Sequence, residues 1–218
     1  MRLYLRLTSN NKLVPFDYQR FLVGTFHKWI GSNDIHNDLS LYSLSWLTDG
    51  KANNGGLNFR NGSGWFISAA DDSLIKTVLR GITLDSTVCF GMDVKEVTIQ
   101  KTPDFESEHR FSVNSPVLVK KSTDGHQRHL GFEERESDEI MTLILKAKLQ
   151  KSGINSDGVE VQFDRSYGGA KRKMVTYRGV GNKANLCPVI VHGTSEQIGF
   201  AWNVGIGHST GIGFGALN

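Results

Sequence analysis

The sequence predicts an α+β protein built from two successive halves, each with the element order β-α-β-β-α-β. Apolar residues repeat with strand and helix periods over the first hundred residues. A proline-containing break follows at Thr102–Asp104, and the same order begins again after it. This is the order of a ferredoxin-like, or RRM-like, unit. We therefore expect two tandem ferredoxin-like domains, over residues 1–103 and 104–218.

The first half carries the clearer patterns. Apolar residues alternate over 2–8, which predicts a half-buried strand. Apolar residues at helical spacing come next, in a helix opened by Pro15 and Asp17 and stopped at Gly31. The remaining elements are a strand at 41–47, a flexible polar connection at 48–64, a strand at 65–69, a helix at 72–80 capped by Asp71 and closed by Gly81, and a strand at 88–99.

The second half repeats this order less regularly. A strand over 110–121 is interrupted by Ser115-Pro116 and followed by a polar loop at 122–129. Ser137 is expected to cap a helix whose apolar stripe contains Ile140, Leu143, Ile144, Ala147 and Leu149. The remaining elements are strands at 159–163 and 174–177 with Gly168-Gly169 near the turn, a strand at 189–192, a short helix capped by Ser195, and a last short strand at the C-terminal end.

Composition narrows the class of protein. With 39% hydrophobic and 22% charged residues, the chain has the balance of an ordinary soluble globular protein. No apolar run approaches the roughly 20 residues that span a bilayer, and the N-terminal residues alternate instead of forming a signal peptide. Cys89 and Cys187 lie far apart, which excludes a disulfide framework and a Cys-x-x-Cys metal site. We expect a cytoplasmic protein.

Positive charge is concentrated in one stretch although the net charge is only +3. Residues 165–183 contain no acid and six basic residues: Arg165, Lys171, Arg172, Lys173, Arg178 and Lys183. An acidic run lies at 133–139. A local basic stretch can bind phosphates. Charge alone equally allows a solvated lysine-rich hairpin.

The C-terminal end is rich in glycine. Five glycines fall within residues 205–215, called the glycine segment below: Gly205, Gly207, Gly211, Gly213 and Gly215. Such a run can present backbone N–H groups to a phosphodiester, or form a tight crossover between elements. We do not expect a dinucleotide or P-loop site, because the sequence leaves no room for a helix after the glycines.

The motif Gly-Ile-Gly-x-x-x-x-x-Gly-Phe-Gly in this segment resembles the signature loop of the CRISPR-associated repeat-processing endoribonucleases, which belong to the repeat-associated mysterious protein superfamily. Other features agree in order: His36 after the first helix, Trp65-Phe-Ile-Ser-Ala before the second, and Ser115-Pro116-Val117 at the start of the second half. The resemblance covers nearly the whole chain and implies metal-independent cleavage of CRISPR precursor transcripts within their repeats, without a cofactor.

That cleavage is an attack by a ribose 2′-OH on the adjacent phosphate, which leaves a 2′,3′-cyclic phosphate and a 5′-OH. It needs a base, an acid and positive charge. The resemblance implies that His36 is the catalytic histidine. His27 is either the second catalytic group or a partly buried helix residue. Tyr42 is a candidate to orient the 2′-OH and Lys51 to stabilise the phosphate, although a packed tyrosine and a loop lysine are the alternatives.

RNA contacts are expected from the basic stretch and the glycine segment: Arg165, Lys171, Arg172, Lys173, Arg178, Gly205, Gly207, His208, Ser209, Thr210, Gly211 and Gly213. The expected partner is CRISPR repeat RNA, and the resemblance also allows a CRISPR effector complex and a homodimer. Two alternatives stay open. One is a non-catalytic RNA-binding subunit of the same superfamily, and the other is a tandem ferredoxin-like protein unrelated to RNA.

Overall fold

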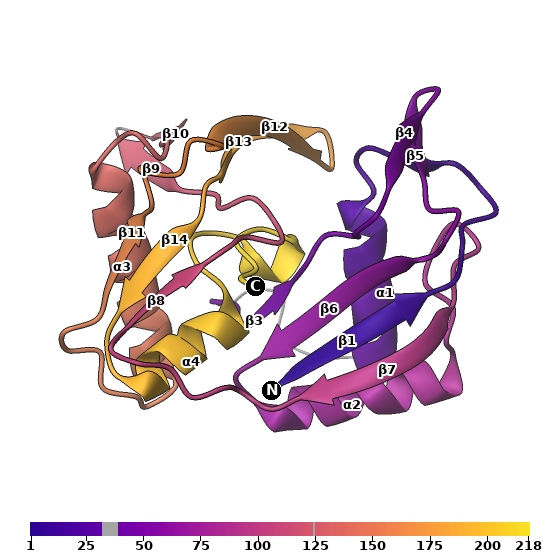
Figure 1. Cartoon of the computed structure of the whole chain (residues 1–218), viewed down its shortest axis with the longest axis horizontal. Helices are drawn as coiled ribbons and strands as arrows, with labels where there is room; N and C mark the ends of the chain where they lie inside the picture. Colours follow the sequence, from indigo (N-terminus) through magenta and orange to yellow (C-terminus); the bar gives the residue numbers. More distant parts are fainter. Residues whose placement is uncertain (32–38, 124) are drawn as a thin grey trace.

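The structure is a computed structural model that describes residues 1–31, 39–123 and 125–218. Its first half is built on an antiparallel sheet with the order β3-β6-β1-β7 (Figure 1). The strands are β1 (Arg2–Leu7), β3 (Tyr42–Leu44), β6 (Ser63–Ala69) and β7 (Val94–Gln100). Apolar residues of the helices α1 (Gln19–Ile30) and α2 (Asp72–Leu84) pack with those of β1 and β6 in one core. The predicted order of strands and helices is therefore present in this half.

The predicted flexible connection at 48–64 is wrong. It contains a hairpin of β4 (Lys51–Asn53) and β5 (Gly56–Asn58), to which β2 (Val14–Pro15) adds a third strand. The two turn residues Asn54 and Gly55 both have positive φ, at 32° and 88°. An Asn-Gly pair with this geometry is the preferred two-residue hairpin turn. Pro15 belongs to β2 and residues 16–18 form a turn, so α1 begins only at Gln19.

Helix α2 is capped by Asp71 as predicted. The Asp71 side chain accepts a hydrogen bond from the Ser73 amide at 2.7 Å. The helix does not end at Gly81 but continues to Leu84. Gly81 lies where α1 crosses α2, and a Cβ at this position would lie 2.4 Å from the Trp29 carbonyl oxygen. The glycine therefore allows two helix backbones to approach each other, and it is not a stop signal.

The second half contains a three-stranded antiparallel sheet with the order β11-β14-β8. Its strands are β8 (Glu108–Phe111), β11 (Glu160–Phe163) and β14 (Val189–His192), and its helices are α3 (Glu136–Lys151) and α4 (Ser195–Val204). In place of the expected last strand, the C-terminal residues make single backbone hydrogen bonds to the chain after β8. Asn114 N donates to Ala216 O at 2.8 Å and Asn218 N to Ser112 O at 2.9 Å. The protein is thus α+β with several antiparallel sheets.

Two hairpins extend from this half (Figure 1). The first, β9 (Lys120–Thr123) with β10 (His126–His129), replaces the predicted polar loop at 122–129, and the predicted strand at 110–121 survives only at its two ends. The second pairs β12 (Lys171–Tyr177) with β13 (Val180–Leu186). Its turn is Arg178-Gly179, with φ of 48° and 82°. Gly168-Gly169 do lie in a turn between β11 and β12, as predicted, but these two strands do not pair with each other.

The predicted caps and the stripe of α3 need correction. Ser137 does not cap α3; it is buried inside the first turn, and its hydroxyl donates to Glu134 O at 2.6 Å. Leu143 from the predicted stripe is 65% exposed. The face that α3 buries consists of Ser137, Met141, Leu145, Lys148 and Leu149. Helix α4 is capped by Thr194, through a capping box with Gln197, and not by Ser195. The Ser195 hydroxyl accepts a hydrogen bond from Phe105 N.

Each half has its own main apolar core, and side chains join the halves. The fully buried Arg2 of β1 lies between two aromatic rings, with its guanidinium carbon 3.9 Å from the centre of Phe66 and 3.6 Å from that of Trp202 on α4. Its Nη2 also donates to Trp202 O at 2.8 Å. No helix in the described part of the chain is long and apolar enough to span a membrane.

Gly81→Ala is expected to lower the free energy of unfolding by about 1–3 kcal/mol, because the new methyl group overlaps the backbone of α1 at Trp29. Gly24→Ala is the matched control. Gly24 is exposed on α1, and a Cβ there meets no atom within 4 Å. We expect this variant to gain about 0.5–1 kcal/mol. Urea unfolding followed by circular dichroism measures both; equal effects would contradict the close helix crossing.

Candidate functional site

The glycine segment follows α4 and folds back on itself. Ile206 N donates to Gly215 O at 2.9 Å, and His208 N donates to Leu118 O at 2.8 Å. A Cβ at Gly215, where φ is 62°, would lie 1.8 Å from Ile206 O, so only glycine fits there. Most of the segment is buried, and His208, Ser209 and Ile212 are half-buried.

Most amides of this segment are therefore used by the fold. Gly205 N donates to Ala201 O, Gly213 N to Thr210 O and Gly215 N to Pro116 O. The consecutive amides of Ser209, Thr210 and Gly211 make no hydrogen bond to another described residue. They begin the short 3₁₀ turn η2 (Thr210–Ile212). Of the predicted backbone donors, these three and Gly207 N have no hydrogen-bond partner among the described residues.

Tyr42 of β3 lies directly against this turn. A Cβ at Gly211 would come within 2.8 Å of Tyr42 Oη, and the Thr210 hydroxyl donates to Tyr42 O at 3.0 Å. Burial raises the pKa of Tyr42, so its hydroxyl stays a neutral hydrogen-bond donor at neutral pH. Its ring stacks on Phe26 at 4.8 Å between ring centres, and Phe26 contacts the half-buried His27 edge to face at 5.4 Å.

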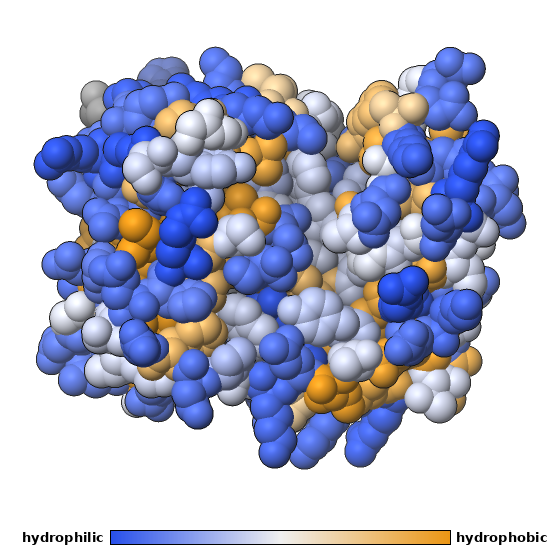
Figure 2. All heavy atoms as spheres, viewed as in Figure 1, coloured by the Kyte–Doolittle hydropathy of each residue, from blue (hydrophilic) through white to orange (hydrophobic). Residues whose placement is uncertain are grey.

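The basic hairpin β12–β13 reaches the same junction from the second half (Figure 1). Lys173 Nζ lies 4.7 Å from the centre of the Trp46 ring, whose Nε1 donates to Gly213 O at 2.8 Å. Tyr177 is half-buried near Tyr42, and burial raises its pKa. Arg178 follows at the turn, with its guanidinium carbon 5.8 Å from the centre of the Tyr177 ring. Figure 2 shows the surface hollowed between this hairpin and the β4–β5 hairpin.

Other predicted residues lie elsewhere. His36 falls within residues 32–38 and lies outside the described residues. Lys51 is exposed on β4, in a hollow that it shares with Arg6 and Arg60. No hydrogen bond or ion pair between described residues joins Lys51 to Tyr42 or to the glycine segment. The structure therefore brings together Tyr42, the glycine segment and the tip of the basic hairpin, but not Lys51.

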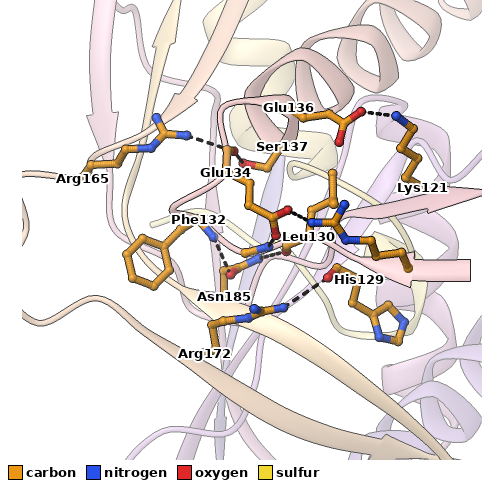
Figure 3. A network of polar contacts seen from close by, with 12 residues as sticks. Lys121, His129, Leu130, Phe132, Glu134, Glu136, Ser137, Arg165, Arg172 and Asn185 are labelled. Atoms are coloured by element: carbon orange, nitrogen blue, oxygen red, sulfur yellow. Dashed lines mark hydrogen bonds and ion pairs between the residues drawn. The ribbon is translucent and has the colours of Figure 1, made fainter.

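The acidic run at 133–139 binds part of the predicted basic stretch (Figure 3). Arg165 Nη1 lies 2.7 Å from Asp138 Oδ2, and its Nη2 donates to Glu134 O. Lys121 pairs with Glu136 in the same region. Arg172 donates to the backbone carbonyl of His129 at 3.1 Å. The charge of Arg165 is thus neutralised by Asp138. The two residues are 27 positions apart in the sequence, so no local pattern predicts this ion pair.

A group of cations beside the glycine segment was missed in the sequence. Lys120 N donates to His208 Nδ1 at 3.2 Å, and Lys120 faces His129 in the β9–β10 pairing. Burial lowers the pKa of His129, and the positive charges of Lys120, Lys183 and Arg172 lower it further. Burial lowers the pKa of His208, and the positive charge of Lys120 lowers it further. This positive environment favours bound anions. The sequence signal that could have revealed it is the His and Lys residues that pair in the β9–β10 hairpin.

Lys148 of α3 donates hydrogen bonds to the end of α4 and to the glycine segment. It is 1% exposed, and its ammonium donates to Val204 O at 3.0 Å, Gly205 O at 3.3 Å and the Thr210 hydroxyl at 3.0 Å. It forms no ion pair with a described residue. Burial lowers its pKa to about 7. In the sequence it looks like one more solvent-facing lysine of an amphipathic helix.

A family model and several solved structures are similar to this chain. A family model described as "CRISPR associated protein Cas6, C-terminal" matches residues 100–218. A solved structure of a Cas6-related protein from Pyrococcus furiosus is similar to this chain, with a TM-score of 0.85 and 17% identity over 100% of this chain and 97% of the other.

Two further solved structures are similar over 100% of this chain and 98% of each of theirs. One, described as a RAMP protein binding different RNA substrates, has a TM-score of 0.84 and 17% identity. The other, described as the CRISPR associated protein Cas6, has a TM-score of 0.82 and 18% identity. No curated protein matches the chain by sequence.

Lys148→Met is expected to remove a pH dependence of stability. The pKa of Lys148 falls from 10.5 in the unfolded chain to about 7 in the folded protein. Between these values the unfolded chain binds more protons, so stability rises with pH, by up to about 1.4 kcal/mol per pH unit for one proton. The variant should lose this rise between pH 7 and 10 in urea unfolding, whereas Lys146→Met on the same helix keeps it. A rise that persists in Lys148→Met would contradict the assignment.

Proposed function

The chain belongs to the Cas6 family of CRISPR-associated proteins, and on that premise we propose that it is a metal-independent endoribonuclease that cuts CRISPR precursor transcripts within their repeats. In the proposed reaction a ribose 2′-oxygen bonds to the adjacent phosphorus and the bond to the 5′-oxygen breaks. A base accepts the 2′-proton, and an acid supplies a proton to the leaving 5′-oxygen. The products carry a 2′,3′-cyclic phosphate and a 5′-OH.

The observation that carries this proposal is the meeting of Tyr42, Tyr177 and the 3₁₀ turn of the glycine segment. A neutral tyrosine hydroxyl and three consecutive amides offer hydrogen bonds to phosphate or ribose oxygens. Arg178 adds positive charge at the same place. Groups from both halves form the site, so one bound RNA strand can be aligned for in-line attack. In this proposal the two halves are a tandem pair of ferredoxin-like domains, and the site lies between them.

We assign the proton transfers to His36 and His27, because histidine titrates near neutral pH. His27 is connected to Tyr42 through the ring of Phe26, which supports a role near the scissile phosphate. Tyr42 orients the 2′-OH. Phosphate contacts come from the cations that the acidic run leaves unpaired, among them Lys171, Lys173 and Arg178.

The first test is cleavage of synthetic repeat RNA in EDTA, with the product ends identified. Wild type should give a 2′,3′-cyclic phosphate. His36→Ala and His27→Ala should each lower the rate by about 10²–10⁴-fold, the usual contribution of a general acid or base. Both variants should keep RNA affinity near that of wild type.

A repeat RNA with one 2′-deoxy nucleotide at the cut site is the matched control, and it should bind but resist cleavage. A requirement for Mg²⁺, or full activity after loss of both histidines, would contradict the mechanism. Binding of the repeat without any cutting by wild type would favour the alternative, a non-catalytic RNA-binding subunit.

Gly211→Ala tests the junction itself. The added methyl group would lie 2.5 Å from Ser40 Oγ and 2.8 Å from Tyr42 Oη, so it separates the glycine segment from β3. We expect a loss of cleavage rate of at least about tenfold, the equivalent of 1.4 kcal/mol in the transition state. Gly168→Ala is the control, because a Cβ there meets no atom within 4 Å. Unchanged cleavage by Gly211→Ala in a folded variant would place the site elsewhere.

A further inference from the structure

A hollow of about 840 Å³ lies at the outer end of the first half, where β1 ends and β6 begins. Its wall contains Arg6 from β1, Lys51 from the β4–β5 hairpin and Arg60 from the connection to β6. All three side chains are exposed. This volume lies within the range of ligand sites, about 300–1,000 Å³.

The charges of this hollow are not balanced by the protein. Some exposed cations elsewhere are paired with carboxylates, as Lys28 is with Asp85 and Arg110 is with Asp164. Arg6, Lys51 and Arg60 form no ion pair with another described residue. The only acid that lines the hollow among the described residues is Asp49, which accepts a hydrogen bond from the Thr48 hydroxyl at 2.8 Å. The hollow therefore attracts anions.

A second hollow of about 630 Å³ continues on the other side of the same two arginines. It shares Arg6 and Arg60 with the first and adds Lys95 beside Glu96. Cations thus follow one another along a groove from Lys51 through the arginines to Lys95. A single small anion needs one such position, whereas a row of positions fits the regularly spaced phosphates of a nucleic-acid strand.

The wall contains the asparagines Asn53, Asn58 and Asn61, and neither hollow is lined by an aromatic side chain of the described residues. Bases therefore have no ring to stack on, and contacts to the strand are expected at its phosphates. We propose that this groove, the basic end groove, binds the backbone of a single-stranded stretch of the RNA substrate outside the cleavage site, without regard to sequence. The proposal rests on the proposed function.

The position of the groove sets its substrate requirement. It lies at the far end of the first sheet from the second half, whereas the glycine segment lies at the junction between the halves (Figure 1). An RNA that fills only the junction does not reach it. A repeat RNA that carries single-stranded extensions engages both sites.

The experiment compares Arg6→Gln/Arg60→Gln with wild type. The matched control is Lys76→Gln/Arg80→Gln, which removes two exposed cations from α2, a helix that packs on the other face of the sheet. Affinity is measured over a salt series for a minimal repeat RNA and for the same repeat with poly(A) or poly(U) extensions at both ends. Thermal unfolding checks that all variants are folded.

The groove variant should bind extended RNA more weakly than wild type. Its slope of log K against log salt should be smaller by about 0.7 for each phosphate that the two arginines neutralise in wild type. The weakening should be the same for both extension sequences. The minimal repeat should bind all three proteins equally, and the control should match wild type throughout.

Three results would overturn the groove while wild type still cuts the repeat. They are unchanged binding of extended RNA by the groove variant, an equal weakening in the α2 control, and a weakening that depends on the extension sequence. A wild type that neither binds nor cuts any repeat RNA overturns the proposed function itself, so the two failures are distinguishable.

Discussion

The arrangement of the junction depends on the buried amino group of Lys148. It donates to Val204 O and Gly205 O at the start of the glycine segment and to the Thr210 hydroxyl in its turn. Thr210 then donates to Tyr42 O in the first half. One side chain from α3 thereby links helix α4, the 3₁₀ turn and β3. An apolar side chain could fill the space, but it would leave these acceptors unpaired in the interior, at a cost of about 1–3 kcal/mol each.

Pairing with acids decides which positive charges remain available for the proposed RNA substrate. The acidic run beside α3 binds Arg165, Lys121 and Arg128, and this fixes the β9–β10 hairpin and the start of the basic stretch. Cations without such partners are left at the tip of the β12–β13 hairpin and in the basic end groove. A net charge of only +3 therefore still permits a strongly basic surface, because the acids gather where the fold needs them.

Local patterns predicted the elements of the first half well, since a period of two in β1 and the Asp71 cap are set by neighbouring residues. The Asn54-Gly55 turn is also a local signal, and the hairpin that it forms was predictable from the sequence. Gly81 and Lys148 belong to another class. Their roles depend on Trp29 and on the glycine segment, which the fold brings close across long stretches of chain. No local pattern contains that information. Whether His36 lies at the junction stays a prediction.

A glycine can be required by a ligand or by the fold, and the positions of the glycine segment differ in the atoms that surround them. At Gly205, Gly207 and Gly215 a Cβ would lie within 2.6 Å of a backbone oxygen of the protein itself, so close packing alone demands glycine. At Gly211 the nearest atoms are instead the side-chain oxygens of Ser40 and Tyr42. The signature is therefore mainly a folding requirement, and the part that we propose for it in cleavage belongs to the turn that Lys148 holds against Tyr42.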